Sequence, residues 1–294
     1  VTAPRKDETA FAAMRSQMKA LLENRSNSPR AAFQDTIQVT LTQGHPRARP
    51  LTAEAFDQID LDRAFAFYQD RFADASDFTF VFVGAFRPAD IRPLVETYLG
   101  SLPNLDRDES WRDLDIDPPG GVIAKEVRKG LEPQSETQII FTGAFEYTHQ
   151  NRLGIRILSS VLQTRLREVV REEMSGSYGV SVDRSYRLFP DPGYTIRISC
   201  GSDPERVEEI VAAIFREIRS FREDGPSTED VEAAKEQARR TREINLEENA
   251  WWVTQLRYSY EEKHDPLLLL DDSRMDEVTP GTIRRDANLW LRLD

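Results

Sequence analysis

Arg171 and Tyr178 are the side chains whose types and spacing suit them best to chemistry. Arg171 lies near the end of a predicted helix, and Tyr178 begins a predicted strand after the turn Ser175-Gly176-Ser177. A guanidinium group donates a forked pair of hydrogen bonds to a peptide carbonyl or a carboxylate. A phenol directed at a tetrahedral intermediate stabilises its oxyanion. The two groups could therefore orient a peptide and support an oxyanion, with the nucleophile and metal supplied from elsewhere.

Each of these side chains also has an ordinary structural interpretation. An Arg at a helix end usually complements the helix dipole. A Tyr that alternates with Val180 and Val182 is typical of a half-buried core residue. Glu172 and Glu173 could act as an acid and a base. Because adjacent residues on a helix point in different directions, we expect them to be surface charges instead.

The histidines and the cysteine of the chain do not form a recognisable metal motif. The three histidines are His45, His149 and His264, and none has the neighbours required by His-x-x-Glu-His or His-Glu-x-x-His. In those motifs two imidazoles on one helix face bind zinc and the Glu activates a water molecule. The single cysteine, Cys200, cannot build a thiolate zinc site. We therefore expect this chain to bind no metal and to be inactive by itself.

The pattern of apolar residues predicts an α+β fold, with antiparallel sheets packed against helices. Residues 78–83 are apolar on both faces, as in a strand in the middle of a covered sheet. The aromatic stripe of the predicted helix 60–72 is expected to lie in a core. Residues 32–41 fit a helix or a helix-strand mixture. Further helices are predicted at residues 8–23, 91–99, 151–173, 204–221 and from 227 to about 252, and strands at 122–127, 137–142, 178–182 and 194–200, the last two as an antiparallel pair.

Residues 104–121 are polar and rich in Asp, Pro and Gly, which makes them the best candidate for a linker. The composition of the 294-residue chain permits one large domain or two ordinary ones. A net charge of −12 argues against nucleic acid and anionic membrane surfaces as partners. No apolar run approaches the length of a membrane span, and no signal peptide or initiator Met is present. We expect the chain to be a piece of a longer polypeptide.

The segment from Leu166 to Val182 resembles the substrate-gripping motif of pitrilysin/insulinase-type zinc proteases, the inverted zincins. In the non-catalytic half of that family, an Arg and a Tyr seven positions apart reach a peptide held by the zinc half. Arg171 and Tyr178 have this spacing. The resemblance extends from about Arg49 to Trp252, and includes the segments Phe78–Gly84, Leu102-Pro103, Gly130–Ser135, Gly225-Pro226 and Asn249–Trp252.

The resemblance is greatest to the bacterial branch built as one chain of four domains. It implies that residues 1–115 complete a preceding α+β domain and that residues 116–294 form the C-terminal domain with Arg171 and Tyr178. The zinc would be bound by a missing N-terminal half, which becomes the partner that cleaves a peptide enclosed between the halves. The same branch implies a periplasmic location.

Two other functions fit the same residues. Catalytically inactive relatives act as structural or assembly subunits, although such a role gives no reason to keep both Arg171 and Tyr178. A peptide-binding or chaperone-like module would instead capture strands at a sheet edge. Peptide affinity that does not depend on Arg171 and Tyr178 would favour this last function.

Overall fold

A computed structural model describes residues 4–174, 179–270 and 273–293, with residues 172–174 described by their backbone alone. The chain forms two compact units, Val1–Gly130 and Leu131–Asp294. The division falls after residue 130, nine residues beyond the end of the predicted linker, residues 104–121. The assignment of the units to consecutive domains of a longer protein stays a prediction. Each unit is described separately.

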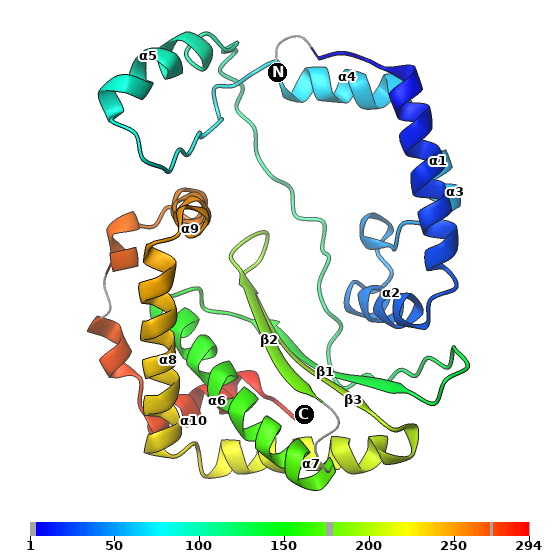
Figure 1. The fold of residues 1–294 in the computed structure, drawn as a ribbon, viewed down its shortest axis with the longest axis vertical. Helices are drawn as coiled ribbons and strands as arrows, with labels where there is room; N and C mark the ends of the chain where they lie inside the picture. The colour runs from blue at the N-terminus through cyan, green and yellow to red at the C-terminus, as the bar shows by residue number, and fades with distance from the viewer. Residues whose placement is uncertain (1–3, 175–178, 271–272, 294) are drawn as a thin grey trace. The chain divides into compact units, whose positions relative to one another are not determined.

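Unit 1 consists of helices joined by extended segments (Figure 1). All of the α-helices of this unit except Pro88–Tyr98 start at a side chain that accepts a backbone hydrogen bond, such as Ser28 from Ala31 and Thr52 from Ala55. The cap at Ser28 and Pro29 at the first helical position explain why residues 29–41 are helical throughout. The elements are α1 (Glu8–Arg25), α2 (Pro29–Leu41), a 3₁₀ turn (Pro46–Ala48), α3 (Ala53–Asp57), α4 (Leu61–Arg71) and α5 (Pro88–Tyr98).

Two predicted strands, residues 78–83 and 122–127, are not strands in this structure. A strand needs a neighbour to pair its backbone groups, and the described part of unit 1 contains no strand that could supply one. The apolar side chains are correspondingly uncovered, with Phe80 46% and Phe82 48% exposed. The prediction that the stripe on α4 lies in a core is also wrong, since no residue of α4 is buried and Phe67 is 67% exposed.

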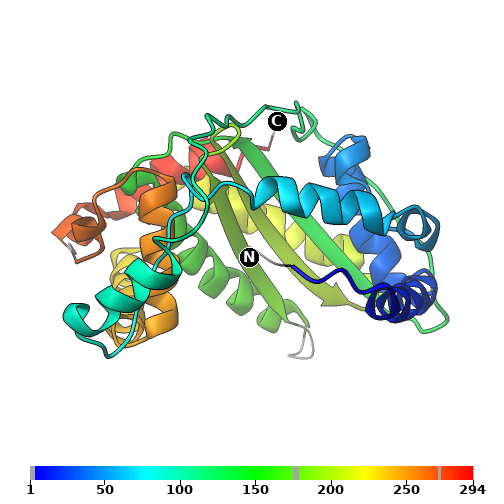
Figure 2. The same cartoon turned by 90° about the horizontal axis from the view of Figure 1, so that it is seen from above.

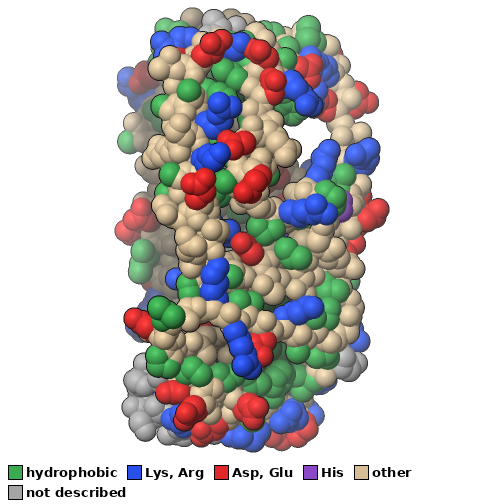
Figure 3. Space-filling model, turned by 90° about the vertical axis from the view of Figure 1, so that its right-hand side faces the viewer, with side chains coloured by type: hydrophobic (Ala, Val, Ile, Leu, Met, Phe, Trp, Pro, Cys, Tyr) green, Lys and Arg blue, Asp and Glu red, His purple; other side chains and the backbone are tan. Residues whose placement is uncertain are grey.

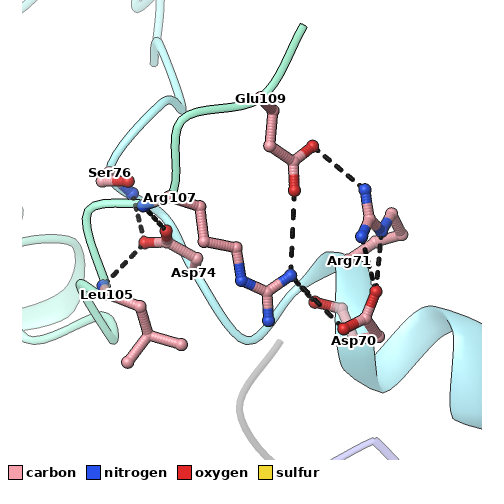
Figure 4. A network of polar contacts seen from close by, with 7 residues as sticks. All are labelled: Asp70, Arg71, Asp74, Ser76, Leu105, Arg107 and Glu109. Carbon is pink, nitrogen blue, oxygen red and sulfur yellow. Dashed lines mark hydrogen bonds and ion pairs between the residues drawn. The ribbon is translucent and has the colours of Figure 1, made fainter.

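A buried carboxylate holds together the segments that follow α4 and α5 (Figure 4). Asp74 accepts backbone hydrogen bonds from Ser76 at 3.0 Å, Leu105 at 2.9 Å and Arg107 at 2.8 Å. These bonds, led by that from Leu105, hold the pKa of Asp74 well below its usual value against the opposing effect of burial. The carboxylate thus joins two loops that are about thirty residues apart in the sequence.

An exposed group of charges surrounds this carboxylate (Figure 4). Arg107 donates to the carbonyl oxygen of Asp70 at 2.9 Å, and Arg71 pairs with the Asp70 carboxylate at 2.6 Å. Glu109 pairs with Arg71 at 3.0 Å. Because these pairs are in contact with solvent, each adds little stability, and the backbone bonds of the buried carboxylate fix the loop conformation.

We predict that the Asp74→Asn variant loses amide protection at Leu105 and Arg107, measured by hydrogen exchange corrected for intrinsic rates. A lowered folded-state pKa means that the contribution of Asp74 is fully present above the unfolded carboxyl pKa of about 3.9 and is lost as the pH falls below it. Protection in the unaltered chain should therefore fall on acidification, with a weaker pH dependence in the variant. The exposed Asp77→Asn serves as the control. Equal protection in the Asp74→Asn variant and the unaltered chain would contradict this role.

Unit 2 contains an antiparallel sheet of three strands in the order β1-β3-β2 (Figure 1). In the register, Ile198 of β3 lies between Ile139 of β1 and Val182 of β2. The predicted antiparallel pairing of the last two strands is confirmed. The alternation of buried and less buried residues along β3 gives the sheet one apolar face. The strands are β1 (Ser135–Ala144), β2 (Val180–Arg187) and β3 (Gly193–Ser202).

Helices cover the apolar face of this sheet (Figures 1 and 2). The central helix, α6 (His149–Met174), buries Leu158, Leu162 and Leu166 completely. α7 ends at Gly225, whose φ of +77° and hydrogen bond to Phe221 form a left-handed cap. The remaining elements are 3₁₀ turns at Pro204–Arg206, Pro266–Leu270 and Ser273–Glu277, and helices α7 (Val207–Glu223), α8 (Thr228–Leu246), α9 (Asn249–Glu261) and α10 (Pro280–Trp290).

The helix predicted from residue 227 to about 252 is two helices, α8 and α9, separated by Glu247 and Glu248. The indole N–H of Trp252 donates to the carbonyl oxygen of Leu246 at 2.8 Å, which caps the end of α8. Apolar periodicity continues across this break, so the sequence pattern alone did not reveal it. The antiparallel α+β fold class that the sequence predicted is confirmed by the three-stranded antiparallel sheet of unit 2 and the helices packed on it.

A glycine on α6 allows α10 to approach closely. A Cβ atom at Gly154 would clash with the carboxylate of Asp286 and lie 3.4 Å from Trp290. Asp286 is only 2% exposed, and burial raises the pKa of its carboxyl group. Its Oδ1 atom accepts a hydrogen bond from Arg285 at 2.8 Å, so the carboxylate is held in place.

We predict that Gly154→Ala lowers the free energy of unfolding of unit 2 by about 1–3 kcal/mol, the usual cost of overpacking. A helical Gly→Ala change without a clash should instead stabilise by up to about 1 kcal/mol. Gly281→Ala in α10 is the matched control, because its Cβ would meet only Thr279 at 3.7 Å. Urea unfolding followed by tryptophan fluorescence distinguishes the two, and stabilisation by Gly154→Ala would contradict the close approach.

Candidate functional site

The two residues selected from the sequence differ in what the structure shows of them. Arg171 lies in the last turn of α6 and is exposed, as a ligand-binding guanidinium must be. Its guanidinium group makes no hydrogen bond or ion pair with a described residue. Tyr178 lies outside the described residues, and its contact with a peptide stays a prediction.

Strand β2 runs back along α6, and Gln163 fixes this arrangement. The side-chain amide of Gln163 donates to the carbonyl oxygen of Val180 at 2.8 Å. Its Oε1 atom accepts a hydrogen bond from the Val182 amide at 2.6 Å. These backbone groups belong to the edge of β2 that faces away from β3, so Gln163 occupies positions that an added strand would need. Capture of a strand at this part of the edge would require Gln163 to move.

A pocket of about 590 Å³ lies within unit 2, where α6, β2, α8 and α9 meet. Among the described residues, its lining includes five arginines and two acidic residues, Glu262 and Asp265. Counted over these described residues, five positive charges less two negative ones leave an excess of three, in a chain whose net charge is −12. On the surface drawn in Figure 3, basic and acidic side chains are interspersed. The arginines are Arg152, Arg156, Arg184, Arg242 and Arg274.

Both acidic residues of the pocket have partners. The Tyr147 hydroxyl donates to Glu262, and burial together with this bond raises the pKa of Tyr147. Arg152 donates to the other Glu262 oxygen at 3.4 Å and lies 5.0 Å from the centre of the Tyr147 ring. His264 stacks on the same ring, and its Nε2 lies 3.5 Å from Glu262. Asp265 accepts from the Leu267 amide at 2.9 Å.

Arg184 differs from these residues because its guanidinium group makes no hydrogen bond or ion pair with any described residue. It lies on the same face of β2 as Val182 and Tyr186, which also line the pocket. The side chain is exposed at the pocket, but the surrounding protein removes enough water from the guanidinium group to lower its pKa. The adjacent acid, Asp183, points to the opposite face of the strand.

The polar residues of α6 that line the pocket share one side of the helix with Arg171. At 100° per residue, Arg152, Arg156, Arg167 and Arg171 fall within an arc of about 100°. Their spacings of four, eleven and four residues are each close to a whole number of helical turns, so all four lie on the same side of the helix. We refer to these four residues as the arginine stripe.

The described residues contain no group of three or more His, Cys, Asp or Glu side chains that could hold a metal. The two carboxylates of the pocket accept hydrogen bonds from donors of the protein itself, Glu262 from Tyr147 and Asp265 from the Leu267 amide. No described helix is long and apolar enough to cross a membrane.

Comparison with known protein families gives one match, over residues 58–238, to a model described as the peptidase M16 inactive domain. The chain belongs to this family. The predicted membership of a zinc-protease family, in its non-catalytic part, is thereby confirmed. The matched region includes more than half of unit 1 and most of unit 2, and contains both Arg171 and Tyr178.

Similar proteins bear the names of zinc proteases. The chain is 27% identical to a "Zinc protease PQQL-like" of Arabidopsis thaliana over 73% of this chain and 24% of that protein. It is 28% identical to the "Probable zinc protease PqqL" of Haemophilus influenzae over 53% of this chain and 16% of that protein. The solved structure of the periplasmic protease PqqL from Escherichia coli matches 97% of this chain and 32% of its own, with a TM-score of 0.82 and 17% identity. This chain thus spans less than a third of each of these proteins.

The residues that line the pocket were not predicted from the sequence. Arg152, Arg156 and Arg184 each follow an ordinary helix or strand pattern. The only available signal was the helical spacing of the arginines between residues 152 and 171. The helical periodicity of this segment was used to predict its apolar face alone. Arg184 could not be added to that group, because its position depends on the direction in which β2 runs along α6.

We predict that Glu262→Gln destabilises unit 2 by about 2–3 kcal/mol, because Arg152 would lose its charged partner in a mostly buried site. The side chains of Glu262 and Arg152 are 9% and 22% exposed. The adjacent Glu261→Gln is the control, since its exposed pair with Arg257 should change stability by less than about 0.5 kcal/mol. Equal urea midpoints for the two variants would contradict a stabilising role for Glu262.

Proposed function

We propose that this chain is the substrate-holding half of a zinc-dependent endopeptidase, active only together with a zinc-bearing N-terminal half of the same polypeptide. The family match to an inactive domain and the names of the relatives support this proposal. The observation that carries it is Arg171, an exposed guanidinium group without a described partner, seven residues before Tyr178. Hydrolysis itself would take place at the zinc of the other half.

In this proposal the two side chains bind and orient the peptide. Arg171 donates hydrogen bonds to a backbone carbonyl or carboxylate of the substrate, which fixes the register of the peptide. Tyr178 donates to the oxyanion that forms at the cleaved bond. A peptide enclosed between two halves must fit the enclosed volume, so short or flexible substrates are expected. The periplasm is the proposed location, supported by the similarity to the periplasmic protease PqqL of Escherichia coli.

A structural or assembly subunit is the alternative function, and it differs from this proposal because it takes no part in peptide cleavage. Strand capture by a chaperone-like module is less favoured, because Gln163 already occupies part of the β2 edge. At β1, the other edge strand, no described side chain forms a hydrogen bond with the backbone groups that face away from β3. The same measurement therefore has to distinguish all three functions.

We predict that a quenched fluorescent peptide is cleaved by the mixture of this chain and its zinc-bearing half, and by neither alone. Tyr178→Phe should lower kcat about a hundredfold, as expected for the loss of an oxyanion donor. Arg171→Gln should lower kcat/KM about tenfold or more, through the loss of charge-assisted hydrogen bonds. Tyr260→Phe, in an exposed position of α9 that does not line the pocket, is the matched control.

The outcomes separate the three functions. Cleavage that is insensitive to both substitutions would retain the peptidase role and remove Arg171 and Tyr178 from the site. Association of the two halves without cleavage would favour a structural subunit. Peptide binding by this chain alone that is unchanged in both variants would favour a strand-capturing module.

A further inference from the structure

The pocket of unit 2 has an uncompensated positive charge at its wall. The two acids in its lining are engaged, Glu262 with Tyr147 and Arg152, and Asp265 with the Leu267 amide. Arg184 lines the same pocket as these two acids but makes no hydrogen bond or ion pair with them, and among the described residues the only acid that acts on its charge is the neighbouring Asp183. Removing water from a guanidinium group is costly unless an anion or other acceptor replaces it.

The chemistry of the lining identifies the kind of anion. Arg184 presents a planar fork of N–H donors, which matches the geometry of a carboxylate. Tyr186 lies two residues further along the same face of β2 and provides an aromatic wall. A volume of about 590 Å³ is large enough for a side chain with part of its backbone.

We propose that this pocket binds an acidic side chain of an extended peptide, with Arg184 as the residue that pairs with the carboxylate. The inference rests on the proposed function, because it concerns the same peptide that Arg171 would hold. It adds a second point of recognition and assigns a substrate class, peptides that carry Glu or Asp at a defined distance from the bond to be cleaved.

The arginine stripe connects the pocket with Arg171 and sets that distance. From Arg156 to Arg171 the helix rises about 22 Å, at about 1.5 Å for each of the fifteen steps from one residue to the next. An extended peptide covers this length with about seven residues. Arg167 lies between the two points on the same side of α6 and is exposed, so it adds a positive charge between them.

The experiment measures binding of labelled peptides to the full chain by fluorescence anisotropy at low salt. The peptides have about ten residues, a length chosen from the expected spacing, and are amidated at the C-terminus. One contains Glu and the other Gln at the same positions. We expect the Glu peptide to bind about tenfold more tightly, since charge-assisted hydrogen bonds are about twice as strong as neutral ones. The difference should shrink as salt is added.

The Arg184→Gln variant should lose this preference and bind the Gln peptide with an unchanged Kd. The Arg184→Glu variant should prefer a Lys peptide, a reversal that a misfolded protein would not show. Arg219→Gln is the control with the same loss of charge, because Arg219 is exposed on α7 and does not line the pocket. Circular dichroism verifies that each variant is folded.

Equal affinity of the unaltered chain for the Glu and Gln peptides would overturn the inference and leave the proposed function intact. A preference that persists in Arg184→Gln would also overturn it, by placing recognition elsewhere. A Gln peptide with a free C-terminal carboxylate that binds as tightly as the Glu peptide would show that a terminus, rather than a side chain, is recognised. Binding of no peptide at all would overturn the inference, whereas the proposed function, which requires both halves, is tested separately by cleavage in the mixture.

Discussion

The packing of helix α6 against the apolar face of the sheet is the interaction on which the rest of unit 2 depends. Each fully buried Leu of this helix contributes about 1.5–3 kcal/mol of hydrophobic stabilisation. The same packing leaves one side of α6 available for polar residues, and there the arginine stripe lies. Because β2 follows α6 and is held against it by Gln163, Arg184 reaches the pocket that the stripe adjoins. Helix α6 thus contributes its apolar side to the core and its polar side to the candidate site.

Charge is distributed unevenly in this protein. The chain is strongly acidic as a whole, yet its pocket has an excess of arginine. Where arginines lie close to one another, their mutual repulsion favours any anion that binds among them. Glu262 is already such an anion in the pocket, because its carboxylate pairs with Arg152 of α6. The proposed substrate carboxylate would be the corresponding anion for Arg184. The need of a guanidinium group for an anionic partner would then govern both stability and recognition.

Unit 1 depends on local contacts rather than on a large core. Its described residues include few buried side chains, among them Phe56 and the carboxylate of Asp74. Residues 78–83 are apolar and extended, but no strand in the described part of the unit lies beside them. Such segments normally become strands only when neighbouring strands complete their hydrogen bonds and cover their side chains. This agrees with the proposal that unit 1 is part of a larger domain.

The sequence by itself determined the helix that starts at Asp60, the amphipathic α6 and the strand pair β2 and β3, because caps and apolar periodicity act over a few residues. It also indicated the family, from the spacing of Arg171 and Tyr178. Whether residues 78–83 form a strand was decided only by tertiary structure, because a strand depends on its neighbours. The pocket was likewise decided only by tertiary structure. Arg156 and Arg184 are distant in sequence, and they line the same pocket only because β2 turns back along α6. Sequence periodicity shows which side of an element is apolar, whereas the packing of the elements determines which polar side chains face one another.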